Sequence, residues 1–280
     1  MSSERLASLE RIVREMGSVL VCYSGGVDSA FVLAVAHRVL GPQAIGMTAV
    51  SPSLAPFEKV AAIEIAKQIG ARHELVDSNE IDNPAYQANG PDRCFHCKSE
   101  LYSISSKMKA VWGSAHVVNG TNLDDLGDYR PGLEAAKNAG VRSPLIEAGF
   151  TKQDVRAASA ELGLAVWDKP ASACLSSRIP FGTQVTRERL AQIAALEARL
   201  KGLGLRQVRV RWHQVGASEN SGALARIEVD RAELVSAFER SSELVAAGKD
   251  AGFAYVTLDL QGYRQGSHNE VLVGRNLRVV

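Results

Sequence analysis

Short apolar runs alternate with helically spaced apolar residues along the first half of the chain. A buried strand is expected where a brief run is wholly apolar, and a helix where apolar residues recur three or four positions apart. This pattern predicts helices over Ser3–Glu15, Ala30–Val39 and Phe57–Ile69, and strands over Val19–Tyr23, Ala44–Val50, His73–Val76 and His116–Asn119. The order β-α-β-α-β implies a parallel sheet with right-handed crossovers, and therefore an α/β fold.

The pattern changes after Thr186. It predicts helices over Arg187–Leu203 and Arg231–Ala247, and strands over Gln207–His213, Ala223–Val229, Tyr255–Leu258 and Leu272–Val273. This order favours a small α+β domain over 186–280, serving acceptor binding, oligomerisation or both. We therefore expect a first domain over 1–168 and, over 169–185, a cysteine-bearing linker loop rich in small residues and proline.

Composition and charge narrow the class of protein. The chain has 280 residues, of which 46% are hydrophobic and 22% charged, as in an ordinary soluble globular protein. The net charge of +1 gives no global field that would recruit nucleic acid or a membrane surface. The first 17 residues are charged and do not resemble a signal peptide, and no apolar stretch approaches the roughly 20 residues that span a bilayer. We expect a cytoplasmic protein without a membrane or nucleic-acid partner.

A glycine turn lies between the first predicted strand and the helix that follows it. Its residues are Ser24, Gly25, Gly26, Val27, Asp28 and Ser29. A strand, a glycine turn and a helix in this order direct backbone N–H groups and hydroxyls at one point, which suits a phosphate group. Asp28 is better suited to a position beside Mg²⁺ or at the helix start than to direct phosphate contact. An ordinary glycine turn is the alternative.

The turn lacks the Walker pattern and instead resembles the PP-loop of ATP pyrophosphatases, whose signature is Ser-Gly-Gly-x-Asp-Ser. That resemblance implies cleavage of ATP between its α and β phosphates, with adenylation of a substrate. A second segment, Gly120–Asp125, follows the predicted strand at His116–Asn119 and also resembles PP-loop relatives. Thr121 and Asp124 are candidate nucleotide ligands, and Asp125 joins Asp28 as a candidate ligand of Mg²⁺. A solvated turn with a helix cap is the alternative for this segment.

The chain has four cysteines, and three of them lie in polar or loop-like contexts. Cys94 and Cys97 form a C-x-x-C pair, expected in a loop, which could hold a metal or cluster or act as a redox pair. A zinc site would need a second such pair, and His96 alone is more often incidental. Cys174 precedes Arg178, which would lower the pKa of the Cys174 thiol if the two were close; the alternative is a linker with an incidental cysteine. The fourth cysteine, Cys22, is expected in the core.

Arg209 and Arg211 lie on one face of their predicted strand, because side chains alternate along a strand. Two guanidiniums on one face suit a second phosphate or a carboxylate. Arg226 and Glu228 share a face of the next strand in the same way. Ion pairing on a solvated face therefore remains an equal alternative.

These motifs together span most of the chain and resemble the LarE family. The residues that carry the resemblance are Ser24–Ser29, Arg93–Lys98 with its C-x-x-C, Gly120–Asn122, Cys174–Pro180 and Val208–Arg211. The resemblance implies an ATP-dependent sulfur transferase of nickel-pincer nucleotide biosynthesis. In that family a carboxylate of a pyridinium-3,5-dicarboxylate mononucleotide is adenylated, and sulfur then replaces AMP to give a thiocarboxylate. The product is the precursor of the lactate racemase cofactor.

The family has two forms that differ in the source of sulfur. In one, a cysteine at the position of Cys174 gives up its own sulfur and becomes dehydroalanine. In the other, three cysteines hold a [4Fe–4S] cluster whose unique iron carries a sulfide. Cys94, Cys97 and Cys174 match the three-cysteine form, which we favour, and three thiolates leave one iron open. The resemblance thus implies ATP, Mg²⁺ and a [4Fe–4S] cluster as cofactors, with Arg178 beside the catalytic thiol and a nucleotide acceptor. We also expect a homo-oligomer.

Three other functions stay open. A PP-loop tRNA thiolase would share the turn and the cysteines but usually adds a basic surface or zinc fingers. An ammonia-using adenylating synthetase would need no cysteine. A nucleotide-sensing module would bind ATP or AMP without releasing pyrophosphate.

Overall fold

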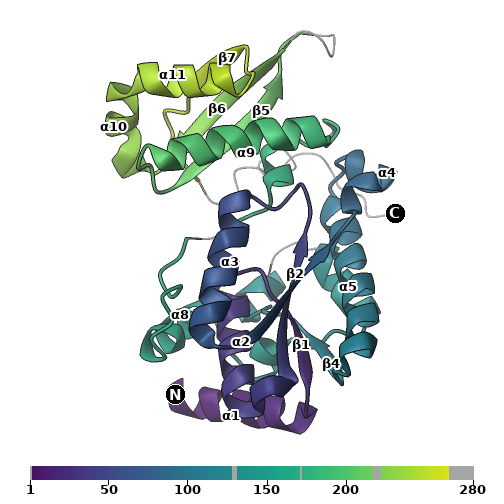
Figure 1. The fold of residues 1–280 in the computed structure, drawn as a ribbon. Helices are drawn as coiled ribbons and strands as arrows, with labels where there is room; N and C mark the ends of the chain where they lie inside the picture. Colours follow the sequence, from purple (N-terminus) through teal and green to yellow (C-terminus); the bar gives the residue numbers. More distant parts are fainter. Residues whose placement is uncertain (1, 128–130, 171, 217–221, 265–280) are drawn as a thin grey trace. The chain divides into compact units, whose positions relative to one another are not determined.

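A computed structural model describes residues 2–127, 131–170, 172–216 and 222–264 (Figure 1). The chain divides into two compact units, Met1–Ser172 and Ala173–Val280. The division falls within the linker expected over 169–185, and the three-part domain organisation itself stays a prediction. Within the described residues, no helix is both long and apolar enough to cross a membrane.

The first unit is built around a parallel sheet of four strands in the order β3-β2-β1-β4 (Figure 1). Its strands are β1 (Val19–Cys22), β2 (Ala44–Val50), β3 (Arg72–Asp77) and β4 (His116–Val118). Its helices are α1 (Ser2–Met16), α2 (Val27–Leu40), α3 (Pro56–Ile69), α4 (Pro84–Gln87), α5 (Arg93–Trp112), α6 (Pro131–Asn138), α7 (Pro144–Glu147) and α8 (Lys152–Glu161). The predicted α/β class is confirmed, because every strand pair in this sheet is parallel.

Helices cover both faces of this sheet, so its central strands are apolar on both sides. Val19 and Val21 of β1 pack into one core with α1, α2 and α8. Leu20 points to the opposite face and packs with β2 residues and with α5. The continuous apolar run of β1 matches this burial on both faces. The glycine turn follows β1 and therefore lies at the carboxyl end of a central strand.

The second unit has a three-stranded sheet in the order β5-β6-β7, with β5 and β6 antiparallel and β6 and β7 parallel. Its elements are α9 (Arg187–Gly202), β5 (Val208–Gln214), β6 (Ala223–Val229), α10 (Leu234–Glu239), α11 (Ser241–Asp250) and β7 (Tyr255–Leu258). Residues at helical spacing along α9 are fully buried: Leu190, Ile193, Leu196 and Leu200. This confirms the predicted α+β unit.

Three sequence expectations differ from the structure or lie outside it. The single helix expected over Arg231–Ala247 is wrong, because the chain leaves the helical conformation at Arg240 and splits into α10 and α11. The loop expected around Cys94 and Cys97 is also wrong, because α5 begins at Arg93 and carries both residues in its first turns. The strand expected at Leu272–Val273 lies outside the described residues.

Candidate functional site

The glycine turn connects β1 to α2 and packs tightly on α3. Gly25 has φ +71°, a conformation that favours glycine, and a Cβ at this position would lie 2.8 Å from Cα of Ala62. Gly26 is the N-cap of α2 and has no side chain to satisfy the first N–H groups of the helix. A ligand or water must therefore accept from them, which is the usual basis of anion binding at a helix start.

The two serines of the turn bond to each other across it. The hydroxyl of Ser29 donates to the Gly26 carbonyl at 3.1 Å and lies 3.2 Å from the Ser24 hydroxyl. The backbone N–H of Ser24 donates to Ser29 Oγ at 3.2 Å. These bonds fix the turn in its conformation before any ligand binds.

The segment after β4 comes close to the same helix start. A Cβ on Gly120 would lie 2.7 Å from the backbone nitrogen of Ser29, so only glycine fits there. Asn119 accepts from the Thr121 N–H at 3.1 Å and from the Ser143 hydroxyl at 2.9 Å. The predicted site residue Thr121 is thus held close to the glycine turn.

Asp28 is joined to this segment by two partners that sequence reasoning missed. Asn122 donates to Asp28 Oδ1 at 3.2 Å, and the ammonium of Lys152 forms an ion pair with Asp28 Oδ2. The Lys152 backbone N–H also donates to Asp124 at 2.7 Å, and the Asn122 N–H donates to Asp125 at 3.0 Å. The expected acidic residues therefore gather in one network. The capping box of Thr151 and Asp154 fixes the start of α8, whose first residue is Lys152.

Lys169 is a further missed residue. Its ammonium donates to the Gly25 carbonyl at 3.0 Å and to Glu58 of α3 at 2.7 Å. The last segment of the first unit is therefore bonded to the glycine turn and to the helix packed on it. A lone lysine in a linker-like segment gives no signal of this contact in the sequence.

The C-x-x-C pair lies at the start of α5. Cys94 is exposed and Cys97 is half-buried, and residues three apart on a helix lie on the same side of it. Burial acts to lower the pKa of the following residue, Lys98, but Tyr102 and nearby thiols raise it above its ordinary value. Those thiols are Cys97, Cys22 and Cys94.

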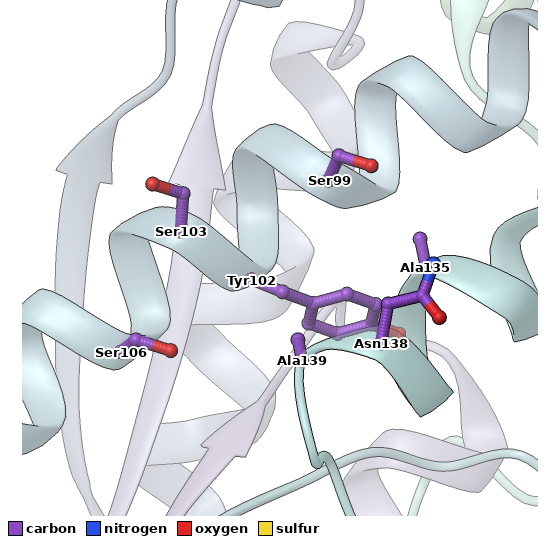
Figure 2. Close-up of a pocket in the computed structure, with 7 residues that line it drawn as sticks. All are labelled: Ser99, Tyr102, Ser103, Ser106, Ala135, Asn138 and Ala139. Atoms are coloured by element: carbon purple, nitrogen blue, oxygen red, sulfur yellow. The ribbon is translucent and has the colours of Figure 1, made fainter.

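Cys22 has the structural role expected of it. Its thiol lies 3.3 Å from the Ser105 hydroxyl, and burial raises the pKa of the thiol above its ordinary value. A hollow of about 260 Å³ lies between α5 and α6. Figure 2 shows its lining: Ser99, Tyr102, Ser103, Ser106, Ala135, Asn138 and Ala139.

Cys94, Cys97 and Cys174 are residues of the right type to bind an iron–sulfur cluster, since thiolates are the usual cluster ligands. Among the described residues, however, no three histidine, cysteine or acidic side chains group closely enough to hold a metal ion. Cys174 belongs to the second unit, whereas Cys94 and Cys97 belong to the first. A shared site for the three thiols therefore stays a prediction.

Cys174 itself is exposed and directly precedes a short 3₁₀ turn, Leu175–Arg178. Arg178 is buried and forms a two-point ion pair with Glu197 of α9, at 2.9 and 3.1 Å. Its remaining nitrogen donates to the carbonyls of Ala173 and Cys174, at 2.6 and 2.8 Å. The guanidinium thus contacts the backbone of the cysteine loop.

Arg209 and Arg211 lie on β5 with little exposure, so the face is not solvated, although the ion pairing that was the alternative is present for Arg211. Arg211 forms an ion pair with Glu228 at 2.8 Å and donates to the Ser177 carbonyl at 2.9 Å. Arg209 lies over the ring of Tyr263, and burial, followed by the charge of Arg178, lowers the pKa of Arg209 below its ordinary value. Several guanidiniums therefore share the interior of this unit.

The fold and glycine turn of the first unit define the class of protein. A parallel α/β sheet with Ser-Gly-Gly-x-Asp-Ser between β1 and α2 is the arrangement of the PP-loop nucleotide-binding proteins. No protein-family model matches the chain. The pyridinium-3,5-bisthiocarboxylic acid mononucleotide synthase of Lactiplantibacillus plantarum is 37% identical over 272 residues, covering 97% of this chain and 96% of that protein. The chain belongs to the family of this synthase, the LarE family.

Two uncharacterized relatives also match over most of their length. A protein of Synechocystis sp. is 46% identical over 274 residues, covering 97% of this chain and 99% of its own. A protein of Methanocaldococcus jannaschii is 28% identical over 246 residues, covering 88% of this chain and 90% of its own. The similarity to all three includes both units.

Proposed function

We propose that the protein is an ATP-dependent sulfur transferase of nickel-pincer nucleotide biosynthesis. It adenylates a carboxylate of a pyridinium-3,5-dicarboxylate mononucleotide and converts that group to a thiocarboxylate, releasing AMP and pyrophosphate. The observation that carries the proposal is the 37% identity to the synthase over 97% of the chain. The glycine turn and its network in the first unit support the adenylation step.

ATP would bind with its phosphates at the start of α2, where Gly26 supplies no side-chain cap and the first N–H groups of the helix can donate to an anion. The Lys152 ammonium, now paired with Asp28, is a cation available beside that point. Asp28 and Asp125 are the carboxylates that would hold Mg²⁺, a metal that prefers such oxygen ligands. The uncharged adenosine part of ATP would extend along the carboxyl edge of the sheet toward β2.

The acceptor would bind through Arg209 and Arg211. Guanidiniums form strong bidentate bonds to phosphate and carboxylate, but that of Arg211 is already bidentate to Glu228, so the acceptor would have to displace this carboxylate to bind Arg211 in the same way. The Arg211 bond to Ser177 joins this strand to the loop of Cys174. Acceptor binding would therefore place the reacting carboxylate on the side of the protein that carries this thiol.

For the sulfur source we propose a [4Fe–4S] cluster on Cys94, Cys97 and Cys174, which would supply sulfide to the adenylated carboxylate. The exposed positions of Cys94 and Cys174 leave both thiols accessible to a ligand. The exposed Cys174 thiol equally suits the second candidate, in which Cys174 gives up its own sulfur.

The first experiment supplies ATP and the acceptor and identifies the products. We expect AMP and pyrophosphate, with release of pyrophosphate strongly reduced in Asp28→Asn and Ser29→Ala. ADP and orthophosphate from the wild type would contradict the proposal. The control is Ser159→Ala on α8, a buried serine outside the glycine turn, which should keep wild-type activity.

The second experiment distinguishes the two sulfur sources. Protein purified without oxygen is assayed for iron and sulfide, and its intact mass is measured before and after turnover. Iron, sulfide, an unchanged mass and repeated turnover with added sulfide support the cluster. Loss of one H₂S from Cys174, with no iron in the protein, supports the sacrificial cysteine.

A further inference from the structure

A buried carboxylate joins the carboxyl ends of β2 and β3. Glu80 lies in a short 3₁₀ turn after β3 and is only 4% exposed. Ser53 donates to its Oε1 at 2.8 Å, and Ser78 donates to its Oε2 at 2.7 Å. The Ser51 hydroxyl donates to Oε1 as well. Three hydroxyls therefore compensate the cost of burying this carboxylate.

Two of these serines belong to the loop between β2 and α3. Ser51 also accepts the Ser53 N–H at 3.2 Å, and the Leu54 N–H donates to the Ser51 carbonyl at 3.1 Å. The backbone adds a bond from the Ser78 N–H to the Val50 carbonyl at 2.9 Å. The conformation of the β2–α3 loop thus depends on a residue of the neighbouring strand connection.

The loop leads directly into the helix that supports the glycine turn. α3 begins at Pro56, and its Glu58 bonds to Lys169, which also bonds to the Gly25 carbonyl. One turn further, Ala62 contacts Gly25 and accepts from the Tyr23 hydroxyl at 2.9 Å. A change at the start of α3 therefore reaches the turn through a short chain of direct contacts.

The charges along the sheet edge also indicate which side of the glycine turn each part of a nucleotide would occupy. Toward β4 the turn adjoins Asp28, Asp124, Asp125 and Lys152, which suit phosphates and their cation. Toward β2 the edge carries the Ser-Pro-Ser-Leu loop, whose hydroxyls are already bound to Glu80. Hydroxyls engaged in this way are not available as donors to a phosphate, which leaves this side for the nucleoside part of the molecule.

We propose that Glu80 is a positioning residue that sets the conformation of the loop over Ser51–Leu54 and thereby the fit of the base of a nucleoside triphosphate. Glu80 is buried among its serine partners and would act through them rather than by contact with the nucleotide. It holds two serines that shape the edge of the sheet and fixes the start of α3 against the glycine turn. This inference rests on the proposed use of ATP.

The test measures ATP-dependent pyrophosphate release with saturating acceptor in Glu80→Ala, Glu80→Gln and Ser53→Ala. Loss of buried hydrogen bonds predicts a rise in the KM for ATP of about tenfold in Glu80→Ala, with kcat within about twofold of wild type. Discrimination between ATP and GTP should fall in the same variant. Glu80→Gln keeps an acceptor of the same size and should show a smaller rise, as should Ser53→Ala.

Ser159→Ala, which changes a buried serine of α8, is the matched control and should leave both KM and discrimination unchanged. A fall of kcat and kcat/KM by equal factors, with an unchanged KM, would overturn the positioning role, as would unchanged kinetics in folded Ser53→Ala and Glu80→Gln. If Glu80→Ala does not fold, the other two variants decide the question. A wild type that releases no pyrophosphate would instead contradict the proposed function itself.

Discussion

Arg178 and Glu197 form a buried ion pair in which both carboxylate oxygens meet the guanidinium, at 2.9 and 3.1 Å. The two side chains are 1% and 0% exposed. Glu197 also accepts the Val210 N–H at 3.0 Å, and Arg178 holds two carbonyls of the cysteine loop. One pair thus connects that loop, α9 and β5.

Removing one member of this pair should strongly destabilise the second unit. Glu197→Gln leaves a buried guanidinium without its counter-charge, so we expect a loss of about 3 kcal/mol or more in unfolding free energy. Denaturant unfolding measures it. The control is Arg199→Ala on the same helix, which breaks the exposed pair with Asp250 and should cost less than about 1 kcal/mol. Equal losses in the two variants would contradict the importance of burial.

The close approach of Gly120 to α2 gives a second prediction. Gly120→Ala would place a Cβ 2.7 Å from the Ser29 nitrogen, so the helix start or the β4 segment must move. We expect nucleotide affinity to fall about tenfold or more, because a shift of a few tenths of an ångström disturbs aligned N–H donors. Gly127→Ala, with no atom within 4 Å of its added Cβ, is the control for isothermal titration with ATP.

The third prediction concerns the arginines of β5. Arg209→Lys keeps a positive charge but loses the planar guanidinium, and should raise the KM for the acceptor about tenfold while ATP binding stays nearly unchanged. The exposed Arg206 provides the control variant, Arg206→Ala. A matching loss of ATP binding in Arg209→Lys would place this residue outside the acceptor site.

The fourth prediction is a pH dependence of stability. Burial lowers the pKa of His73, whose Nε2 lies 2.8 Å from the Thr48 hydroxyl. The unfolded chain therefore takes up a proton on this ring at higher pH than the folded protein does. Burial of the neutral His73 ring therefore leaves the free energy of unfolding unaffected by pH above the unfolded pKa of about 6.5. Below that value the free energy of unfolding falls as the pH falls.

His73→Gln retains a donor for Thr48 but cannot titrate in this range. The fall in unfolding free energy between neutral and mildly acidic pH should be less steep in the variant. Identical slopes would show that His73 does not contribute. Burial also lowers the pKa values of His116 and His213, so some of the slope should remain in His73→Gln.

The sequence was sufficient for features that depend on local pattern. The strands Ala44–Val50, Ala223–Val229 and Tyr255–Leu258 have the predicted bounds, because each is an apolar or alternating run between turn residues. The glycine turn was also visible, since it rests on residues a few positions apart. The start of α5 was missed because Cys94, Phe95 and His96 have weak helix propensities.

Contacts between distant segments could not be predicted in this way. Lys152 is 124 residues from Asp28, and Lys169 is 144 residues from Gly25. Neither lysine belongs to a motif, and only the folded sheet brings them to the glycine turn. Glu80 is similar, because a glutamate after a strand is ordinarily a solvated residue and only its three serine partners reveal its burial.

The bond from Lys169 to Gly25 has a mechanical consequence. Lys169 precedes Cys174 by five residues, and the chain between them includes the boundary of the two units. Removing the Lys169 ammonium would release the last residues of the first unit from both the glycine turn and α3.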